Sequence, residues 1–154
     1  MTWVDVRTFT PAEQFEAVKL LRDELRNGYS PAFVPAQETE DGLIEMGWIC
    51  YPDWLWDGVW CGIYLAEHLG AAWERIEGYE HIEDLRTVST LDFGDVYSWF
   101  TAYGCKERLC DGYLAKGAEN GALLALAERY VAIVEGTREY VSAIEEGDAG
   151  KRRE

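Results

Sequence analysis

Residues 97–113 read YSWFTAYGCKERLCDGY, and the predicted elements on either side are arranged around them. In the first half, the apolar residues follow a helical spacing through Trp99 and Tyr103, which predicts a helix that ends at Gly104. A compact polar cluster follows over residues 106–112, where a Glu-Arg pair, a cysteine and an Asp-Gly step come close together. This cluster matches no catalytic or ligand-binding motif of known mechanism, so the sequence does not identify a reaction.

Two interpretations of this cluster are open. Glu107 and Arg108 are adjacent, so on one helix their side chains point about 100° apart and each needs a different partner. The Arg108 guanidinium suits a carboxylate such as Asp111, three residues on. The first interpretation is a buried ion-pair network that fixes helix packing, with Cys110 filling core space. The second is a small-ligand or enzyme site formed by Trp99, Glu107, Arg108, Cys110 and Asp111.

The clearest helix start lies near the N-terminus. Thr10 can cap a helix, Pro11 suits its first position, and Glu13 completes a capping box with Thr10. An apolar stripe follows, and Gly28 is predicted to end the helix. Ahead of it, residues 2–9 alternate loosely between apolar and polar, which fits a short edge strand or an extended lead-in.

A second helix is expected from Asp53, as its cap, to about residue 69. Trp56, Trp60 and Tyr64 recur every four residues along it, so they share one helix face. An aromatic stripe at helical spacing predicts a packed core rather than a surface on which bases or sugars stack.

The other segments complete the prediction. Residues 29–39 hold two prolines and are interpreted as a loop, and residues 40–46 as a short helix that ends at Gly47. Beyond the second helix, further helices are expected over residues 71–78, 93–104, 109–118 and 122–146.

Size and composition favour one globular domain. The chain has 154 residues, of which 48% are hydrophobic and 14% aromatic, so it can bury a core. We predict an all-α, compact single domain of five to seven helices over residues 1–147, with room for a small β element near the N-terminus and a frayed tail over residues 148–154. No apolar run approaches the roughly 20 residues that a bilayer span requires, and the N-terminus lacks signal-peptide features. A cytoplasmic location is expected.

The charge is strongly acidic. The net charge is −15, which repels phosphate, so direct nucleic-acid binding is disfavoured and a basic protein partner is favoured. Residues 27–74 contain neither Lys nor Arg. If the carboxylates of this span share a face, that face binds the partner; otherwise they form an ordinary solvated surface. The candidate partner-binding residues are Glu38, Glu40, Asp41, Glu45, Asp53 and Asp57.

Metal and cofactor sites are not indicated. In a cytoplasmic protein, the four cysteines are expected to be small buried hydrophobes rather than disulfide partners. Their spacing lacks the pattern of zinc sites, only two histidines are present, and glycine-rich phosphate loops are absent. No metal and no cofactor are therefore predicted. The cysteines are Cys50, Cys61, Cys105 and Cys110.

Several of these residues together resemble an uncharacterised prokaryotic family, DUF6508. Members typically carry a threonine-alanine helix, then an Arg-Gly-Glu-Arg-Phe-Cys-Asp-Gly segment and a Leu-rich final helix. The chain departs from this pattern at Cys105-Lys106, where Arg-Gly is usual, and at Leu109, where Phe is usual. The resemblance implies kinship and no established activity. It is carried by Thr101-Ala102, Glu107–Gly112, Gly121, Leu123-Leu124 and the upstream Met46–Trp54.

Three functions remain open. The first is a non-enzymatic acidic protein that engages a basic partner; its sharper version is a nucleic-acid mimic, such as a phage or mobile-element inhibitor of a nucleic-acid-binding defence protein. The second is the small-ligand or enzyme site at the cluster. The third is a subunit that oligomerises through exposed Trp or Tyr.

Overall fold

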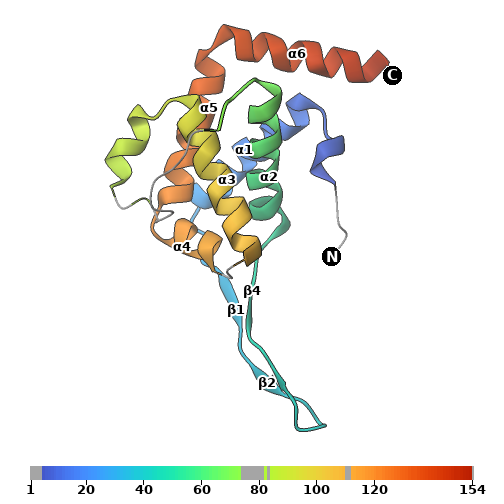
Figure 1. The fold of residues 1–154 in the computed structure, drawn as a ribbon, viewed down its shortest axis with the longest axis vertical. Coiled ribbons are helices and arrows are strands. Elements are labelled where there is room, and N and C mark those ends of the chain that lie inside the picture. The colour runs from blue at the N-terminus through green and yellow to red at the C-terminus, as the bar shows by residue number, and fades with distance from the viewer. Residues whose placement is uncertain (1–4, 74–81, 83, 110–111, 154) are drawn as a thin grey trace.

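The computed structural model describes residues 5–73, 82, 84–109 and 112–153. Within them, a compact helical body carries a narrow β-hairpin that projects from one end (Figure 1). The predicted fold class, a mostly helical domain with a small β element, is confirmed. No described helix is both long enough and apolar enough to span a bilayer. The α-helices are α1 (Pro11–Arg26), α2 (Asp53–His68), α3 (Phe93–Leu109), α4 (Tyr113–Glu119), α5 (Ala122–Gly136) and α6 (Arg138–Arg153).

Helix α1 begins as its sequence predicts. The Thr10 hydroxyl accepts a hydrogen bond from the Glu13 N–H at 3.1 Å, and the Glu13 carboxylate accepts one from the Thr10 N–H at 2.9 Å. This reciprocal pair satisfies two backbone donors that the first helical turn leaves free. Its buried face packs on α2, where a Cβ on Gly58 would lie only 2.6 Å from the Cβ of Leu21. The missing side chain at Gly58 therefore sets how closely the two helices approach.

The core is largely aromatic. Trp56, Trp60 and Tyr64 form the predicted stripe on α2, with successive ring centroids 6.1 Å and 5.9 Å apart. Trp60 is buried and its two neighbours pack against the core, so the packed-core prediction is confirmed. Tyr130 of α5 is fully buried, and its hydroxyl donates to the Gly62 carbonyl at 2.7 Å. This hydrogen bond joins α5 to α2 in the middle of the body.

Helix α2 begins at Asp53 itself. Pro52 precedes it in an extended conformation, and no side-chain hydrogen bond caps its start. The predicted cap is therefore one residue too late, because Pro52 occupies the cap position and Asp53 is the first helical residue. The helix ends at His68, and residues 71–73 are not helical, so the predicted helix over residues 71–78 is wrong at its start, while residues 74–78 lie outside the described part.

Gly104, the predicted end of one helix, and Gly147, the residue after the predicted helix over residues 122–146, both lie inside helices. Helix α3 continues through Gly104, where a Cβ would lie 3.1 Å from Ile63 and 3.2 Å from Trp60 of α2. Helix α6 continues through Gly147, where a Cβ would lie 2.7 Å from Pro11. At both positions the absence of a side chain permits close helix packing, which outweighs the weak helix propensity of glycine.

The predicted single helix over residues 122–146 is two helices. Helix α5 ends at Gly136, and Thr137 has an extended backbone with φ −116° and ψ 107°. The Thr137 hydroxyl donates to the Ile133 carbonyl at 2.7 Å, so it satisfies a carbonyl of the last turn. Apolar residues recur on both sides of this break, and the sequence pattern therefore did not reveal it. The brief helix predicted over residues 109–118 exists as α4, which begins later.

Short 3-10 helices precede α1 and α3. In η1 (Val6–Thr8), the Asp5 carboxylate accepts a hydrogen bond from the N–H two residues on, at 3.0 Å. Asp84 caps the start of η2 (Leu85–Thr90) in the same way at 3.1 Å. The strand or extended lead-in predicted over residues 2–9 is therefore wrong in its described part, because a local Asp cap bends the backbone into a turn.

Candidate partner-binding surface

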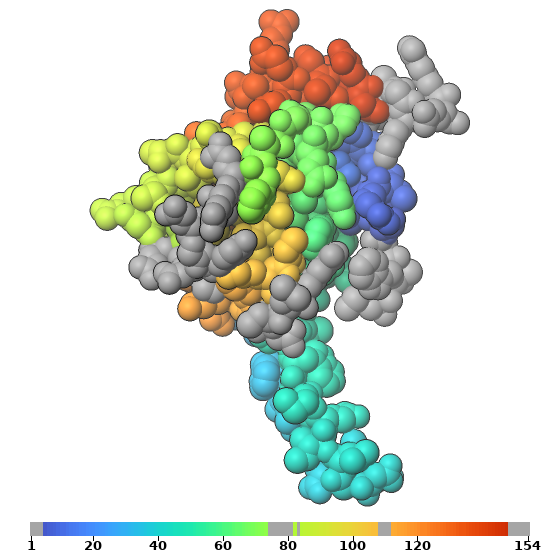
Figure 2. All heavy atoms as spheres, viewed as in Figure 1, coloured from blue at the N-terminus to red at the C-terminus, as the bar shows by residue number. Residues whose placement is uncertain are grey.

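The hairpin consists of four short strands and will be called the arm, residues 32–50. Strand β1 pairs with β4 and β2 with β3, both antiparallel, which corrects the predicted loop over residues 29–39 and the predicted helix over residues 40–46. Space filling shows the arm standing away from the helical body (Figure 2). The strands are β1 (Ala32–Val34), β2 (Gln37–Glu38), β3 (Ile44–Glu45) and β4 (Trp48–Cys50).

The tip of the arm is a tight turn. The Gly42 N–H donates to the Thr39 carbonyl at 3.0 Å, and the Thr39 N–H donates to the Leu43 carbonyl at 2.7 Å. Gly42 has φ +78°, a left-handed conformation that glycine adopts without strain. Asp41-Gly42 is a frequent pair in hairpin turns, and it is the sequence signal that could have revealed the arm.

The middle of the arm explains why the ladder is split into two pairs of strands. Pro35 lies between β1 and β2, and it has no N–H to donate to a neighbouring strand. Gly47 lies between β3 and β4, and a Cβ there would be 2.8 Å from the Phe33 ring. The Phe33 ring thus covers the backbone of Gly47 and stiffens a segment that has few ladder hydrogen bonds.

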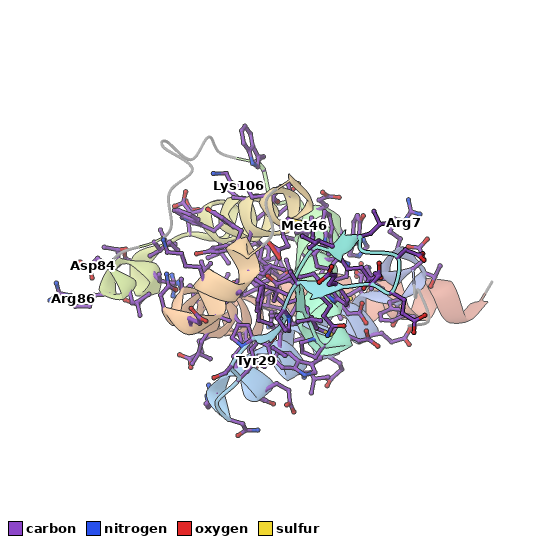
Figure 3. All side chains as sticks on the ribbon, turned by 90° about the horizontal axis from the view of Figure 1, so that it is seen from below. Arg7, Tyr29, Met46, Asp84, Arg86 and Lys106 are labelled. Atoms are coloured by element: carbon purple, nitrogen blue, oxygen red, sulfur yellow. The ribbon has the colours of Figure 1, made fainter. Side chains whose placement is uncertain are left out.

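The arm concentrates exposed apolar side chains. Among the described residues, nine large hydrophobic side chains are exposed, and five of them lie on the arm. Figure 3 views the molecule from the end from which the arm projects, so Met46 appears in front of the helical body. A concentration of this kind on so small an element is typical of an interaction surface. The five are Phe33 (66% exposed), Leu43 (68%), Ile44 (71%), Met46 (79%) and Trp48 (48%).

The structure divides the six predicted partner-binding acids into two groups. Four lie exposed on the arm: Glu38, Glu40, Asp41 and Glu45. Asp53 and Asp57 instead lie in the first turns of α2, beyond the end of β4. Partial burial, and then the nearby charge of Asp53, raise the pKa of the Asp57 carboxyl. Glu38 pairs with Ile44 and Glu45 with Gln37, so Glu38 and Glu45 lie on opposite faces of the β2–β3 ribbon. The four acids therefore share the arm but not one face.

Glu107, in the central cluster, is a structural anchor. It lies near the end of α3, is 6% exposed, and its carboxylate accepts hydrogen bonds from three successive backbone N–H groups at the start of α4. The distances are 3.2 Å from Gly112, 2.9 Å from Tyr113 and 3.4 Å from Leu114. A helix start offers free donors and partial positive charge, so it stabilises a buried carboxylate.

Tyr51 connects this anchor to the arm. This residue comes directly after β4, and its hydroxyl is hydrogen-bonded to the Glu107 carboxylate. The same hydroxyl accepts a hydrogen bond from the Ala115 N–H at 3.1 Å. Burial raises the pKa of the Tyr51 hydroxyl, and the neighbouring carboxylate raises it further. The arm is therefore joined at its base to both α3 and α4.

The alternative ligand site is only partly described. Trp99 is half-buried and packs against Tyr103, with ring centroids 6.2 Å apart. The Arg108 side chain and residues 110–111 lie outside the described part. The structure thus joins Glu107 to Tyr51, a partner that sequence reasoning missed. Backbone donors and Tyr51 contact the Glu107 carboxylate, which gives this one residue a structural role. Both interpretations of the whole cluster stay predictions.

The cysteine prediction is wrong at two positions. Cys61 is fully buried, as expected, whereas Cys50 on the arm and Cys105 on α3 are exposed. Cys110 lies outside the described residues. All three described cysteines are free thiols. In the described part of the chain, no group of three or more His, Cys, Asp and Glu side chains is placed to hold a metal ion.

Comparison with known proteins identifies a family. Residues 10–136 match the model of DUF6508, described as a family of unknown function. No curated protein and no solved structure matches the chain.

Proposed function

The chain belongs to DUF6508, a family of unknown function, and we propose that it is a non-enzymatic interaction protein whose arm binds a basic protein partner. The proposal rests on one observation: a projecting hairpin exposes five large apolar side chains and four carboxylates. No Lys or Arg accompanies them, since residues 27–74 contain none.

Each half of this observation supports a different property of the partner. Aromatic and Met side chains are enriched at protein interfaces, where a few residues supply most of the binding energy, and a partner that covers them removes them from water. The four carboxylates attract a positively charged surface during approach and disfavour acidic partners. The partner is therefore a protein with apolar side chains bordered by Lys or Arg.

Two other occupants of the arm are less compatible with its charge. A second copy that bound arm to arm would bring two sets of carboxylates together without a cation. An anionic membrane surface would likewise repel the acidic tip, although Trp and Met side chains insert readily into bilayer interfaces. Of these three occupants, a basic protein is the one that complements both the apolar side chains and the carboxylates of the arm.

The narrower prediction, nucleic-acid mimicry, is a special case of this proposal. Four carboxylates on one arm supply the negative charge that a mimic needs, while the apolar side chains among them add contacts that nucleic acid does not make. In this version the partner is a nucleic-acid-binding protein and the arm occupies its nucleic-acid site. Duplex DNA would then displace the protein from its partner, whereas an independent site would leave binding unchanged.

The test compares two charge-reversal variants. In the first, Glu38, Glu40, Asp41 and Glu45 are changed to Lys. The matched control changes four exposed glutamates of the body to Lys, so the net charge rises equally: Glu119, Glu135, Glu145 and Glu146. Each protein is used for affinity capture from the cells that produce it, and the captured partner is identified, purified and titrated at about 0.05 and about 0.15 M salt.

We expect a basic partner whose affinity falls at least about tenfold with the arm variant and much less with the body variant. Higher salt should weaken wild-type binding, because it screens the attraction between the carboxylates and the partner. Equal binding by wild type and both variants, or a partner without a basic surface, would refute the proposal.

Oligomerisation through exposed rings remains a competing prediction. Size-exclusion chromatography with light scattering separates it from the arm proposal. A monomer at high concentration removes it, and a dimer that dissociates when Trp48 or Phe33 is changed to Ser would replace the basic partner by a second copy.

A further inference from the structure

Large apolar side chains lie on both faces of the arm. Residues that pair directly across two strands share a face, and successive residues of a strand point to opposite faces. Phe33 pairs with Ile49, and Val34 pairs with Trp48. Phe33 and Trp48 therefore lie on opposite faces of the β1–β4 ribbon, and they are 66% and 48% exposed.

The carboxylates are placed differently from the two rings. Glu40 and Asp41 form the turn at the tip, and Glu38 and Glu45 belong to the β2–β3 pair next to it. The apolar rings of Phe33 and Trp48 lie nearer the body, on β1 and β4. Charge is thus concentrated at the distal end of the arm, and an apolar ring is present on each face at the proximal end.

This distribution specifies the shape of the partner site. A flat partner surface covers one face of a two-stranded ribbon and leaves the ring on the other face in water. A cleft that receives the arm covers both rings, and the inner end of the cleft then contacts the acidic tip of the arm. Resting on the proposed function above, we infer that the arm inserts into a cleft of the basic partner, with apolar walls on two sides and Lys or Arg residues at its inner end.

The base of the arm supports insertion as a preformed element. Tyr51, directly after β4, is held by Glu107 and by the Ala115 N–H, and beyond this base the arm stands away from the described part of the body (Figure 2). An isolated two-stranded hairpin is marginally stable in water, so anchoring at one end limits the ordering that binding requires. The free end then enters the cleft tip first.

Photo-crosslinking in the producing cells tests the two-sided contact directly. The photoreactive amino acid p-benzoylphenylalanine replaces Phe33 in one variant and Trp48 in another, so each face carries one reactive ring. A third variant carries it at Leu20, a 47% exposed residue of α1 outside the arm, as the control. Cross-linked partners and peptides are identified by mass spectrometry.

The cleft predicts that both arm positions form adducts with the same basic protein, at peptides from two different walls, while Leu20 forms none with it. Adducts from one face only would overturn the cleft and leave the proposed function standing. If neither arm position reacts with a protein, or if both react with a second copy of the chain, the cleft and the proposed function fall together.

Two measurements on purified components complete the test. F33S and W48S should each weaken the affinity for the identified partner by about 30-fold, because each removes a central contact from a different wall. A loss with only one of them would contradict the cleft. Flotation with vesicles of phosphatidylcholine and phosphatidylglycerol should leave the protein unbound, and binding through the arm would assign it to a membrane surface instead.

Discussion

At the scale of single residues, Glu107 shows how a buried charge is stabilised by backbone. Its carboxylate accepts from three N–H groups of the α4 start and is hydrogen-bonded to the Tyr51 hydroxyl. These bonds join two consecutive helices to the end of the arm. A charged group buried in this way contributes to stability only while its donors stay in place.

Replacing Glu107 by Gln is expected to lower the free energy of unfolding by about 2 to 3 kcal/mol, because the amide keeps one acceptor oxygen and loses the charge. Urea unfolding followed by circular dichroism measures the change. Glu119 is exposed at the other end of α4, and the E119Q variant should unfold like wild type. An E107Q protein as stable as wild type would show that the cluster does not anchor the fold.

Cys61 differs sharply in environment from the two exposed thiols. Burial, followed by the charges of Asp57 and Glu13, raises the pKa of its thiol from 9.0 to about 12. The neutral thiol is therefore favoured in the folded state. Its contribution to stability is fully present below pH 9 and is lost as the pH rises toward 12.

A thiol reagent at about pH 8 should therefore modify Cys50 and Cys105 quickly and leave Cys61 unmodified until the protein unfolds. Peptide mass spectrometry after timed labelling, with and without urea, distinguishes the sites. Rapid labelling of Cys61 in the folded protein would mean that α2 opens locally far more often than its burial implies.

At the scale of elements, helix packing depends on positions without side chains. A Cβ at Gly58 of α2 would meet the Leu21 Cβ at 2.6 Å, and Leu21 is fully buried and cannot move aside. Gly136, at the end of α5, has open space around it. The two glycines therefore give opposite outcomes for the same substitution.

G58A is expected to destabilise the protein by about 1 to 3 kcal/mol, because overpacking outweighs the gain of roughly 1 kcal/mol in helix propensity. G136A should be neutral or slightly stabilising, since nothing opposes the added methyl group. Thermal unfolding of both variants provides the comparison. Equal effects of the two substitutions would contradict the close approach of α1 and α2.

The strands of the arm were not predicted because their residues show no strand pattern. Alternation along a strand is visible only when one face is buried and the other is polar. Here apolar residues lie on both faces and the strands have only two or three residues, so no period is present. Asp41-Gly42 was a local signal for the turn, but two prolines favoured a loop instead.

At the scale of the whole molecule, the net charge of −15 opposes the compact state. Raising the ionic strength from about 0.01 to about 0.1 M shortens the Debye length from about 30 to about 10 Å. We expect the melting temperature to rise by about 3 °C over this range, as repulsion between carboxylates is screened. Sodium chloride and choline chloride should act alike, and a lower melting temperature in both would contradict net self-repulsion.

The amino-acid sequence by itself determined the local features of this protein. The capping box at Thr10 and Glu13, the aromatic stripe on α2, the acidic base-free span and the family all follow from neighbouring residues or from composition. Each depends on interactions within a turn or two of helix, or on a sum over the chain.

Only the tertiary structure decided which apolar residues stay in water and what the buried carboxylate contacts. The exposure of Met46 and Trp48 depends on the arm leaving the body, and the contact of Glu107 with Tyr51 joins segments far apart in the chain. Whether a helix ends at a glycine or continues through it, as α3 does at Gly104, likewise depends on the side chains that pack against that glycine. Burial and long-range hydrogen bonds are properties of the packed chain, so no local pattern specifies them.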